Sequence, residues 1–500
     1  MPLLQTKSID ELIEASEQPS HRLKKTLGPW SLAFLGVGIV IGSGIFTVTG
    51  TAASGKLKDP GLLQATVLDI IMHGRSAASA LGRPGAGPAI VLSFAAVLVA
   101  CLFAGLCFAE LASMIPIAGS TYTYAYAILG EIFAWIIGWD LILEYAVANM
   151  SVAVGFSAYL QDLGDNIFGF HLPAAIAYPM FPAPGSPGGI YNIPALLITL
   201  AVTWVLVRGV KESAETNTTM VIIKIAAILI FVFGAAGAIN SRNWHPFAPH
   251  GLAGVVSGAS IVFFTYVGFD AVSTAAEECK RPQRDMPFGI IATLIICTLL
   301  YGSVSLVLTG IANWQKLDPD SAVATALKNI GYNRIRLVVS AGALMGMISS
   351  LLVGQYGQAR IWFAMSRDRL LPRAFGAVHQ KFRTPYVGTW IAGLLVGIPS
   401  GLWDIDTFAE LTNIGTLFAF VIVAASVIVL RRTQPSRHRP FRVPLVPLLP
   451  ILSIACCLVL MMGLPLLTWL RFFAWLAIGL GVYFAYSRRQ TEKLAANERG

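Results

Sequence analysis

Apolar residues fall into blocks of about twenty along most of the chain, and short polar stretches separate the blocks. A helix rises about 1.5 Å per residue, so about 20 apolar residues cross the roughly 30 Å of bilayer hydrocarbon. The pattern predicts an all-α polytopic membrane protein with twelve spans. We place them at 27–51, 87–114, 121–160, 193–210, 216–240, 252–276, 287–312, 335–357, 386–403, 407–430, 444–463 and 468–487.

The composition agrees with a membrane protein and argues against a soluble enzyme. Of 500 residues, 56% are hydrophobic and only 12% are charged, whereas soluble chains carry about 25% charged residues. So few charges cannot cover the surface of a soluble globule of this size. The six cysteines form no CxxC pair, so we expect neither a metal site nor disulfides. They are Cys101, Cys107, Cys279, Cys297, Cys456 and Cys457.

The basic residues predict the orientation in the membrane, because cytoplasmic loops are enriched in Lys and Arg. With the N-terminus inside, the inner segments hold 24 of the 35 basic residues and the outer segments hold 10. We therefore expect both termini in the cytoplasm and no nucleic-acid partner, despite a net charge of +9. Residues 1–26 contain no apolar signal-peptide core, and compact loops favour a bacterial inner membrane.

The organisation along the chain follows from these spans. We expect a cytoplasmic tail at 1–26, a ten-helix core at 27–430, helices 11 and 12 at 431–487, and a second tail at 488–500. Residues 52–86 form a long outer loop with its own amphipathic stretch at 62–72.

Two spans contain glycines where an unbroken helix would not need them. Span 1 has the run Gly42-Ser43-Gly44-Ile45-Phe46 near its middle, and span 6 has Gly268 followed by Asp270. Broken helices persist in a membrane only where they line a protein or water cavity. Paired interruptions at corresponding positions of two five-helix halves indicate an inverted-repeat transporter site. The alternative is close helix packing through small residues.

Two broken helices would present opposite electrical poles at the membrane midplane. Free N–H groups suit a carboxylate, and free carbonyl groups suit an ammonium group. The site would therefore fit a zwitterion, of which an α-amino acid is the commonest. We expect Ser43, Gly44 and Ile45 to hold the carboxylate. Carbonyl groups for the amine would come from Val40, Ile41, Val267 and Gly268.

Several motifs, in order, resemble the amino acid–polyamine–organocation superfamily, and specifically its cationic amino acid transporter branch. They are His21-Arg22-Leu23-Lys24-Lys25, the span-1 glycine run, Pro116-Ile117-Ala118-Gly119 with Tyr122-Thr123-Tyr124, 138–145, Gly268-Phe269-Asp270 with Glu277-Glu278, Met365-Ser366-Arg367-Asp368, Arg431-Arg432 and Arg439-Pro440-Phe441. The resemblance implies the LeuT-type fold, a 5+5 inverted repeat in which helices 1 and 6 are unwound around an amino acid. The 52–86 loop is longer than in typical members.

Lys224 lies inside span 5. Burial of an ionisable side chain within the membrane costs free energy, so its presence there indicates a functional role. In proton-coupled relatives a span-5 lysine takes the place of the sodium ion that links span 1 to span 8, and Lys224 matches that position. Its expected partners are span-1 carbonyl groups and Ser349 or Ser350. Loss of the proton would loosen the link. The alternative is a lysine that extends to the cytoplasmic surface.

Two acids and four apolar side chains complete the expected site. Asp270 would accept hydrogen bonds from the unwound span-6 backbone or carry a proton, and Glu144 would face the cavity or pair within the bundle. Glu110 would pair with an inner-loop Arg or Lys. The resemblance implies that the substrate side chain meets Ile45, Phe264, Phe269 and Met347. A bulky thioether at position 347 leaves little room for a guanidinium, which favours small or neutral substrates with broad selectivity.

We therefore predict a secondary transporter that imports amino acids with protons by alternating access, without cofactor, metal or catalytic residues. The expected partners are the amino acid, the proton and the bilayer, and a small single-span membrane subunit is left open. Exchange of amino acids and transport of cationic amino acids or polyamines are the alternatives. The seven histidines are scattered and no Walker A motif occurs, which argues against an enzyme and against ATP as the driving force.

Overall fold

The computed structural model describes residues 6–10, 13–14, 27–56, 62–81, 83–117, 120–182, 187–209, 214–317, 321–382 and 384–488. This part of the chain is mostly helical, with seventeen α-helices, α2 to α18, and several short 3-10 segments. The motif at 21–25 and most of the tails predicted at 1–26 and 488–500 lie outside the described residues.

Eight helical segments are long and apolar enough to cross a membrane, which makes this a multi-pass membrane protein. They contain α5 (Ile90–Met114), α7 (Glu131–Phe168), α10 (Ala214–Ala235), α11 (Gly251–Val262), α12 (Pro282–Ile311), α14 (Asn333–Arg367), α16 (Ile405–Thr433) and α18 (Leu466–Val482). Four shorter apolar helices lie at the other predicted spans: α2 (Pro29–Val40), α9 (Ile193–Arg208), α15 (Tyr386–Ser400) and α17 (Leu448–Met462). Because these four are shorter, the count of twelve spans stays a prediction.

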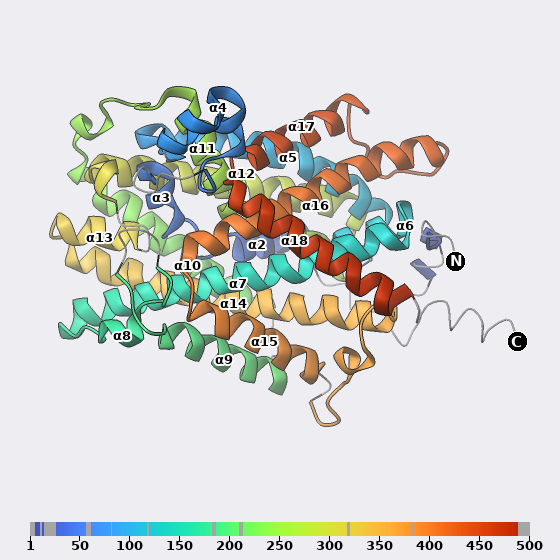
Figure 1. The fold of residues 1–500 in the computed structure, drawn as a ribbon. Helices are drawn as coiled ribbons and strands as arrows, with labels where there is room; N and C mark the ends of the chain where they lie inside the picture. The colour runs from blue at the N-terminus through green and yellow to red at the C-terminus, as the bar shows by residue number, and fades with distance from the viewer. Residues whose placement is uncertain are drawn as a thin grey trace, which may run out of the picture.

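The helices form one bundle around the long helix α7, which packs against α14 and α16, while α5 packs against α12 (Figure 1). Both ends of the described chain meet the same end of this bundle. Lys7 pairs with Asp368 at 2.9 Å, and the Ser487 hydroxyl donates to the Leu370 carbonyl. We call this the terminal end. The helices α4 (Val67–Leu81) and α13 (Ala322–Asn329) lie at the opposite end.

The predicted third span, 121–160, is wrong at its start. The helix α6 (Ser120–Ile128) ends before Gly130, which has a φ of 104° and begins a new direction, and α7 starts only at Glu131. Only glycine adopts such a φ without strain. The eighth predicted span, 335–357, is also too short, because α14 continues for ten more residues to Arg367.

The long loop at 52–86 is folded rather than extended. Its ends meet in a two-stranded ribbon, in which β1 (Gly55–Lys56) pairs with β2 (Arg83–Pro84). The helix α4 begins five residues later than the amphipathic stretch predicted at 62–72. Its start is explained by Thr66, whose hydroxyl accepts the Asp69 N–H and donates to the Asp69 carboxylate. The Thr66 hydroxyl therefore acts as an N-cap, because it accepts one of the backbone N–H groups that the first turn of a helix leaves without a partner.

Candidate functional site

Span 1 is interrupted at its middle. The helix α2 ends at Val40, α3 (Val48–Ser54) begins eight residues later, and residues 41–47 are not helical. Within the described part of the chain, the N–H groups of Ser43, Gly44 and Ile45 donate to no backbone carbonyl. The buried Ser43 hydroxyl also has no hydrogen-bond partner. Four unused donors therefore lie at the N-terminus of α3, where a carboxylate would be stabilised.

Span 6 is interrupted between η4 (Phe263–Tyr266) and η5 (Phe269–Glu278). Val267 has φ −56° and ψ 133°, and Gly268 has φ 103° and ψ −6°. These angles are close to those of a type II turn, which requires a positive φ at its third residue. A Cβ atom on Gly268 would also lie 2.6 Å from Cγ2 of Ile39. The turn therefore needs glycine for its backbone angles and for its contact with span 1.

Tyr301 of α12 connects the two interruptions, and the sequence did not single it out. Its hydroxyl lies 3.1 Å from the Val40 carbonyl oxygen and 3.0 Å from that of Thr265. The side chain is fully buried. The only signal in the sequence is a tyrosine in the middle of an apolar span.

The carbonyl groups predicted to receive a substrate amine are not equally available. The Val40 oxygen accepts from the Gly42 N–H at 2.9 Å and shares the one proton of the Tyr301 hydroxyl with Thr265, so it is partly occupied. The Gly268 oxygen accepts one bond, from Ala271. Among the described residues, no hydrogen bond reaches the carbonyl oxygens of Ile41 and Val267. The geometry therefore favours these two as the acceptors for an ammonium group.

Lys224 of α10 joins span 1 to span 8. Its ammonium donates to the Gly38 carbonyl oxygen at 2.7 Å, and its side chain is fully buried. Its hydrocarbon stem lies against Gly346 of α14, where an added Cβ atom would be 3.4 Å from Lys224 Cγ and Cε. The lysine does not extend to a surface, so its charge lies between α2 and α14.

The serines expected beside Lys224 are near but not bonded to it. The Ser350 hydroxyl is buried and has no hydrogen-bond partner, and it faces Gly42 of the span-1 interruption at 3.3 Å from a Cβ built there. Ser349 is buried on the same helix. The proposed contact of Lys224 with either hydroxyl stays a prediction.

Three buried acids lie close enough to interact, one at the span-6 turn and two on α7. The Asp270 carboxylate interacts with backbone N–H groups of Gly268 and Ala271 at the turn, although one of its oxygens has no partner. Glu144 on α7 meets Thr416 of α16 and also keeps one unpaired oxygen. Asp140, one turn before Glu144, has no hydrogen-bond partner at either oxygen, and the sequence interpretation did not single it out.

The four side chains expected to line the substrate pocket are all buried, but they face different neighbours. Phe264 approaches Gly44, with its ring 3.2 Å from a Cβ built on that glycine. Phe269 instead contacts the rings of Phe108 and Phe420, at 6.0 and 5.0 Å between centroids, and so is also part of the core. Ile45 and Met347 are 1% and 0% exposed.

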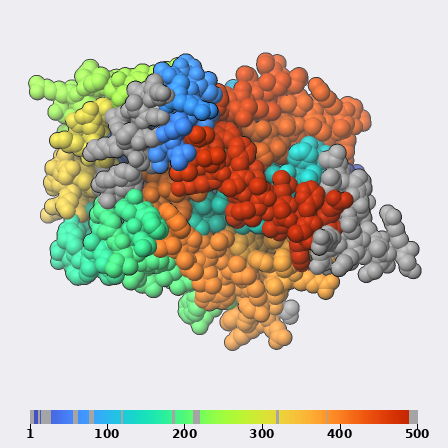
Figure 2. All heavy atoms as spheres, in the orientation of Figure 1, coloured from blue at the N-terminus to red at the C-terminus, as the bar shows by residue number. Residues whose placement is uncertain are grey.

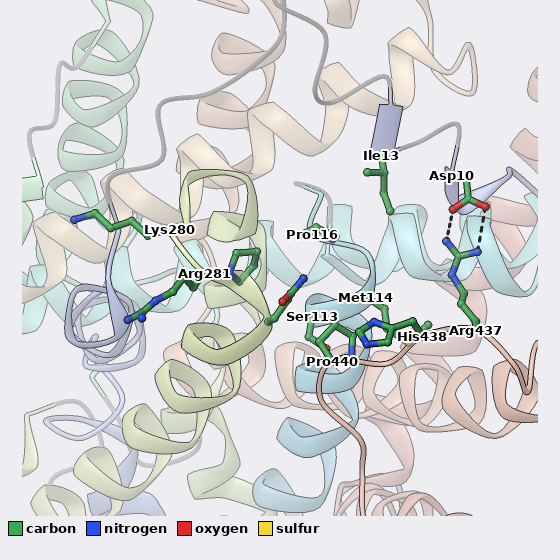
Figure 3. Close-up of a pocket in the computed structure, with 12 residues that line it drawn as sticks. Asp10, Ile13, Ser113, Met114, Pro116, Lys280, Arg281, Arg437, His438 and Pro440 are labelled. Carbon is green, nitrogen blue, oxygen red and sulfur yellow. Dashed lines mark hydrogen bonds and ion pairs between the residues drawn. The ribbon is translucent and has the colours of Figure 1, made fainter.

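Two hollows flank this region. A crevice of about 10 Å³, room for about one water molecule, lies on the side opposite the terminal end, between α3, α11 and α16. A cavity of about 700 Å³ lies at the terminal end, away from the helix breaks (Figure 3). It is lined in part by Ser113, Gln283 and His438, and the Asp10–Arg437 ion pair lies on one side of it.

Two broken membrane helices with unused donors, and a buried lysine between two spans, are typical of a secondary transporter. Comparisons with known proteins agree. The amino acid permease family matches residues 27–483. The chain is 44% identical over 478 residues to the methylthioribose transporter of Bacillus subtilis (strain 168), covering 95% of this chain and 96% of that protein.

Two further relatives have different substrates in their names. The branched-chain amino acid permease BcaP of the same organism is 44% identical over 490 residues, covering 97% and 98% of the two chains. The vacuolar cationic amino acid transporter 4 of Arabidopsis thaliana is 32% identical over 440 residues, covering 87% and 68%. The chain belongs to the amino acid permease family, which confirms the superfamily predicted from its motifs and supports amino acid transport.

Proposed function

We propose that this protein imports a neutral amino acid together with a proton, by alternating access across a bacterial inner membrane. The observation that carries the proposal is the Lys224 ammonium, which donates to Gly38 of span 1 while its stem packs on Gly346 of span 8. A protonated lysine there links the two helices as a bound cation would. Release of its proton removes the link, so the proton gradient can drive the change of conformation.

The substrate class follows from the two poles of the site. Unused N–H groups at Ser43, Gly44 and Ile45 suit a carboxylate, and the free carbonyl groups of Ile41 and Val267 suit an amine. The pocket side chains Phe264 and Met347 are apolar, so a branched-chain or smaller neutral side chain is favoured over a cationic one. An apolar pocket distinguishes one methylene group by only about 1–3 kcal/mol, so we expect several substrates.

Methylthioribose is a second candidate, because a transporter of that sugar is 44% identical to this chain. Methylthioribose carries neither a carboxylate nor an ammonium group. It would leave the charge-adapted donors at Ser43, Gly44 and Ile45 without their counterpart, and buried polar groups without partners are costly. We therefore place an amino acid first.

Twelve spans and an inverted repeat are part of the proposal. The interruptions at 41–47 and at Val267–Gly268 fall in the first helix of each proposed five-helix half. Cytoplasmic termini follow from the excess of basic residues in the inner loops. A small single-span subunit would be sought by co-purification from native membranes.

A thermal-shift panel tests the substrate, with the twenty amino acids and methylthioribose at pH 5 and pH 7.5. A ligand at 100 times its Kd stabilises the protein by about 2.7 kcal/mol. We expect stabilisation by neutral amino acids, followed by uptake into proteoliposomes only with an inward proton gradient. Uptake that needs preloaded amino acid instead of the gradient would replace symport by exchange. Stabilisation by methylthioribose alone would replace the amino acid.

A further inference from the structure

Arg83, at the end of the long loop, is buried in the crevice between α3, α11 and α16. Its side chain is 2% exposed, although it comes from a loop. Nη1 lies 2.8 Å from the Glu410 carboxylate of α16, and Nη2 lies 3.3 Å from the Gly463 carbonyl oxygen. Nε lies 3.4 Å from the Ser257 hydroxyl of α11. One guanidinium therefore contacts span 6, span 10 and the turn between α17 and α18.

Further polar contacts join the same helices beside this arginine. The Thr51 hydroxyl of α3 donates to the Asp406 carboxylate of α16 at 3.1 Å. The Asn413 amide of α16 donates to the Ser260 carbonyl of α11 at 2.8 Å. The half-helices of spans 1 and 6 that lead away from the terminal end are thus both tied to α16. The crevice that remains among them holds about 10 Å³, too little for an amino acid.

Backbone hydrogen bonds hold the loop against neighbouring elements and so fix the position of Arg83. The ribbon of β1 and β2 places Arg83 opposite Lys56, directly after α3. The N–H groups of Leu466 and Leu467 donate to the carbonyl groups of Ala65 and Leu63, which holds the loop on the start of α18. Figure 2 shows the blue surface of this loop against the red surface of the α17–α18 hairpin. The arginine is therefore fixed to elements outside the α16 helix that it binds.

The buried charge of Arg83 is stabilised by carboxylates of α16. Burial lowers the pKa of the Arg83 guanidinium, while the carboxylates of Glu410 and Asp406 oppose that effect. An arginine keeps its proton under all physiological conditions. Separation of Arg83 from Glu410 would break a buried ion pair, which is costly unless water enters. Both partners of the ion pair line the crevice, so a wider crevice at this point requires that they separate.

We propose that the Arg83–Glu410 ion pair is an outer gate, which closes the entrance to the helix breaks when it forms and admits substrate when it separates. Arg83, the cationic partner in this gate, belongs to the long loop at 52–86, whose role the sequence left open. The gate requires alternating access but depends neither on the identity of the substrate nor on proton coupling.

Thiol labelling tests the gate without any transport measurement, so its result is separate from that of the proposed function. Ile261 lines the crevice and is 4% exposed. In a background in which the six native cysteines are replaced, Ile261→Cys is labelled with a membrane-impermeant methanethiosulfonate, from either side of oriented vesicles. We expect Arg83→Gln to raise the labelling rate about tenfold, and only from the side opposite the termini. The reason is that loss of the ion pair would increase the population of an open conformation that is rare in the parent protein.

Three variants complete the test. Arg83→Lys keeps the charge and should restore most of the slow labelling, whereas Glu410→Gln should behave like Arg83→Gln. Arg242→Gln removes an exposed arginine at the same end and should label like the parent. If Arg83→Gln does not fold, Glu410→Gln carries the test. Unchanged labelling in a folded variant of either residue, or faster labelling from both sides, would overturn the gate.

Discussion

The ammonium of Lys224 lies 2.7 Å from the carbonyl oxygen of Gly38. Among the side-chain hydrogen bonds of the described residues, no other Lys or Arg side chain donates to a carbonyl group of span 1. Lys224→Met keeps the length of the stem that packs on Gly346 but removes the charge, so we expect the protein to fold and bind substrate while uptake driven by a pH gradient is lost. Proteoliposome uptake across a range of external pH measures the effect.

Lys280→Met serves as the control for this variant, because it removes an exposed lysine at the terminal end. It should retain uptake and its pH dependence. Full gradient-driven uptake by Lys224→Met would exclude proton coupling through this residue.

Tyr301→Phe tests whether the link between the two interruptions matters. The change removes one hydroxyl that donates toward the carbonyl groups of Val40 and Thr265 and leaves the ring in place. Hydrogen bonds inside membrane proteins contribute about 0.6 kcal/mol on average and about 1.7 kcal/mol at most. We expect the free energy of unfolding to fall by that amount and the KM for uptake to rise, because the Val40 carbonyl would compete for the substrate amine.

Tyr332→Phe is the matched control, since that tyrosine is 36% exposed at the start of α14. Its uptake kinetics should equal those of the parent. A Tyr301→Phe variant with unchanged KM and stability would show that the hydroxyl does not organise the site.

The fold was predictable where the physics is local. Twenty apolar residues in a row require a helix in lipid, and the turn at Gly268 follows from a glycine next to an acid inside an apolar span. Tyr301 and Asp140 escaped the prediction because their importance depends on which helices lie beside them. Arg83 escaped it because a loop arginine is ordinarily solvated, and only the folded loop brings it to Glu410. The start of the third span was misplaced because residues 121–129 carry no charge and run directly into the apolar helix that follows.

Met347→Ser tests the interpretation of substrate selectivity. Met347 is fully buried on α14, and its thioether offers no hydrogen bond to a cationic head group. Replacement by serine removes volume and adds a hydroxyl, so we expect uptake of lysine or arginine to appear while uptake of neutral amino acids falls. Competition of labelled substrate by lysine and arginine measures the change. Met345→Ser, two residues away and 39% exposed, should leave selectivity unaltered, and unchanged selectivity in Met347→Ser would mean that this side chain does not face the substrate.

Glu110→Gln tests the polar contacts at the terminal end, where the expected pairing of Glu110 with an inner arginine is confirmed. Its carboxylate accepts from Arg431 at 2.9 and 2.7 Å and from the Val443 N–H at 2.7 Å. Arg439 lies 3.4 Å away and is also buried. The amide keeps the shape but leaves two guanidinium groups without their anion, so we expect a loss of about 1.5–3 kcal/mol in stability.

This loss should appear as a lower Tm in detergent without a change in substrate selectivity, because Glu110 is distant from the helix breaks in sequence and braces α5 against the connection from α16 to α17. Glu14→Gln, an exposed carboxylate near the same end, should not change the Tm. A Glu110→Gln variant that is as stable as the parent but transports more slowly would contradict this prediction. The ion pairs would then act on the conformational change of transport, because contacts that stabilise only the folded state cannot change a transport rate without changing stability.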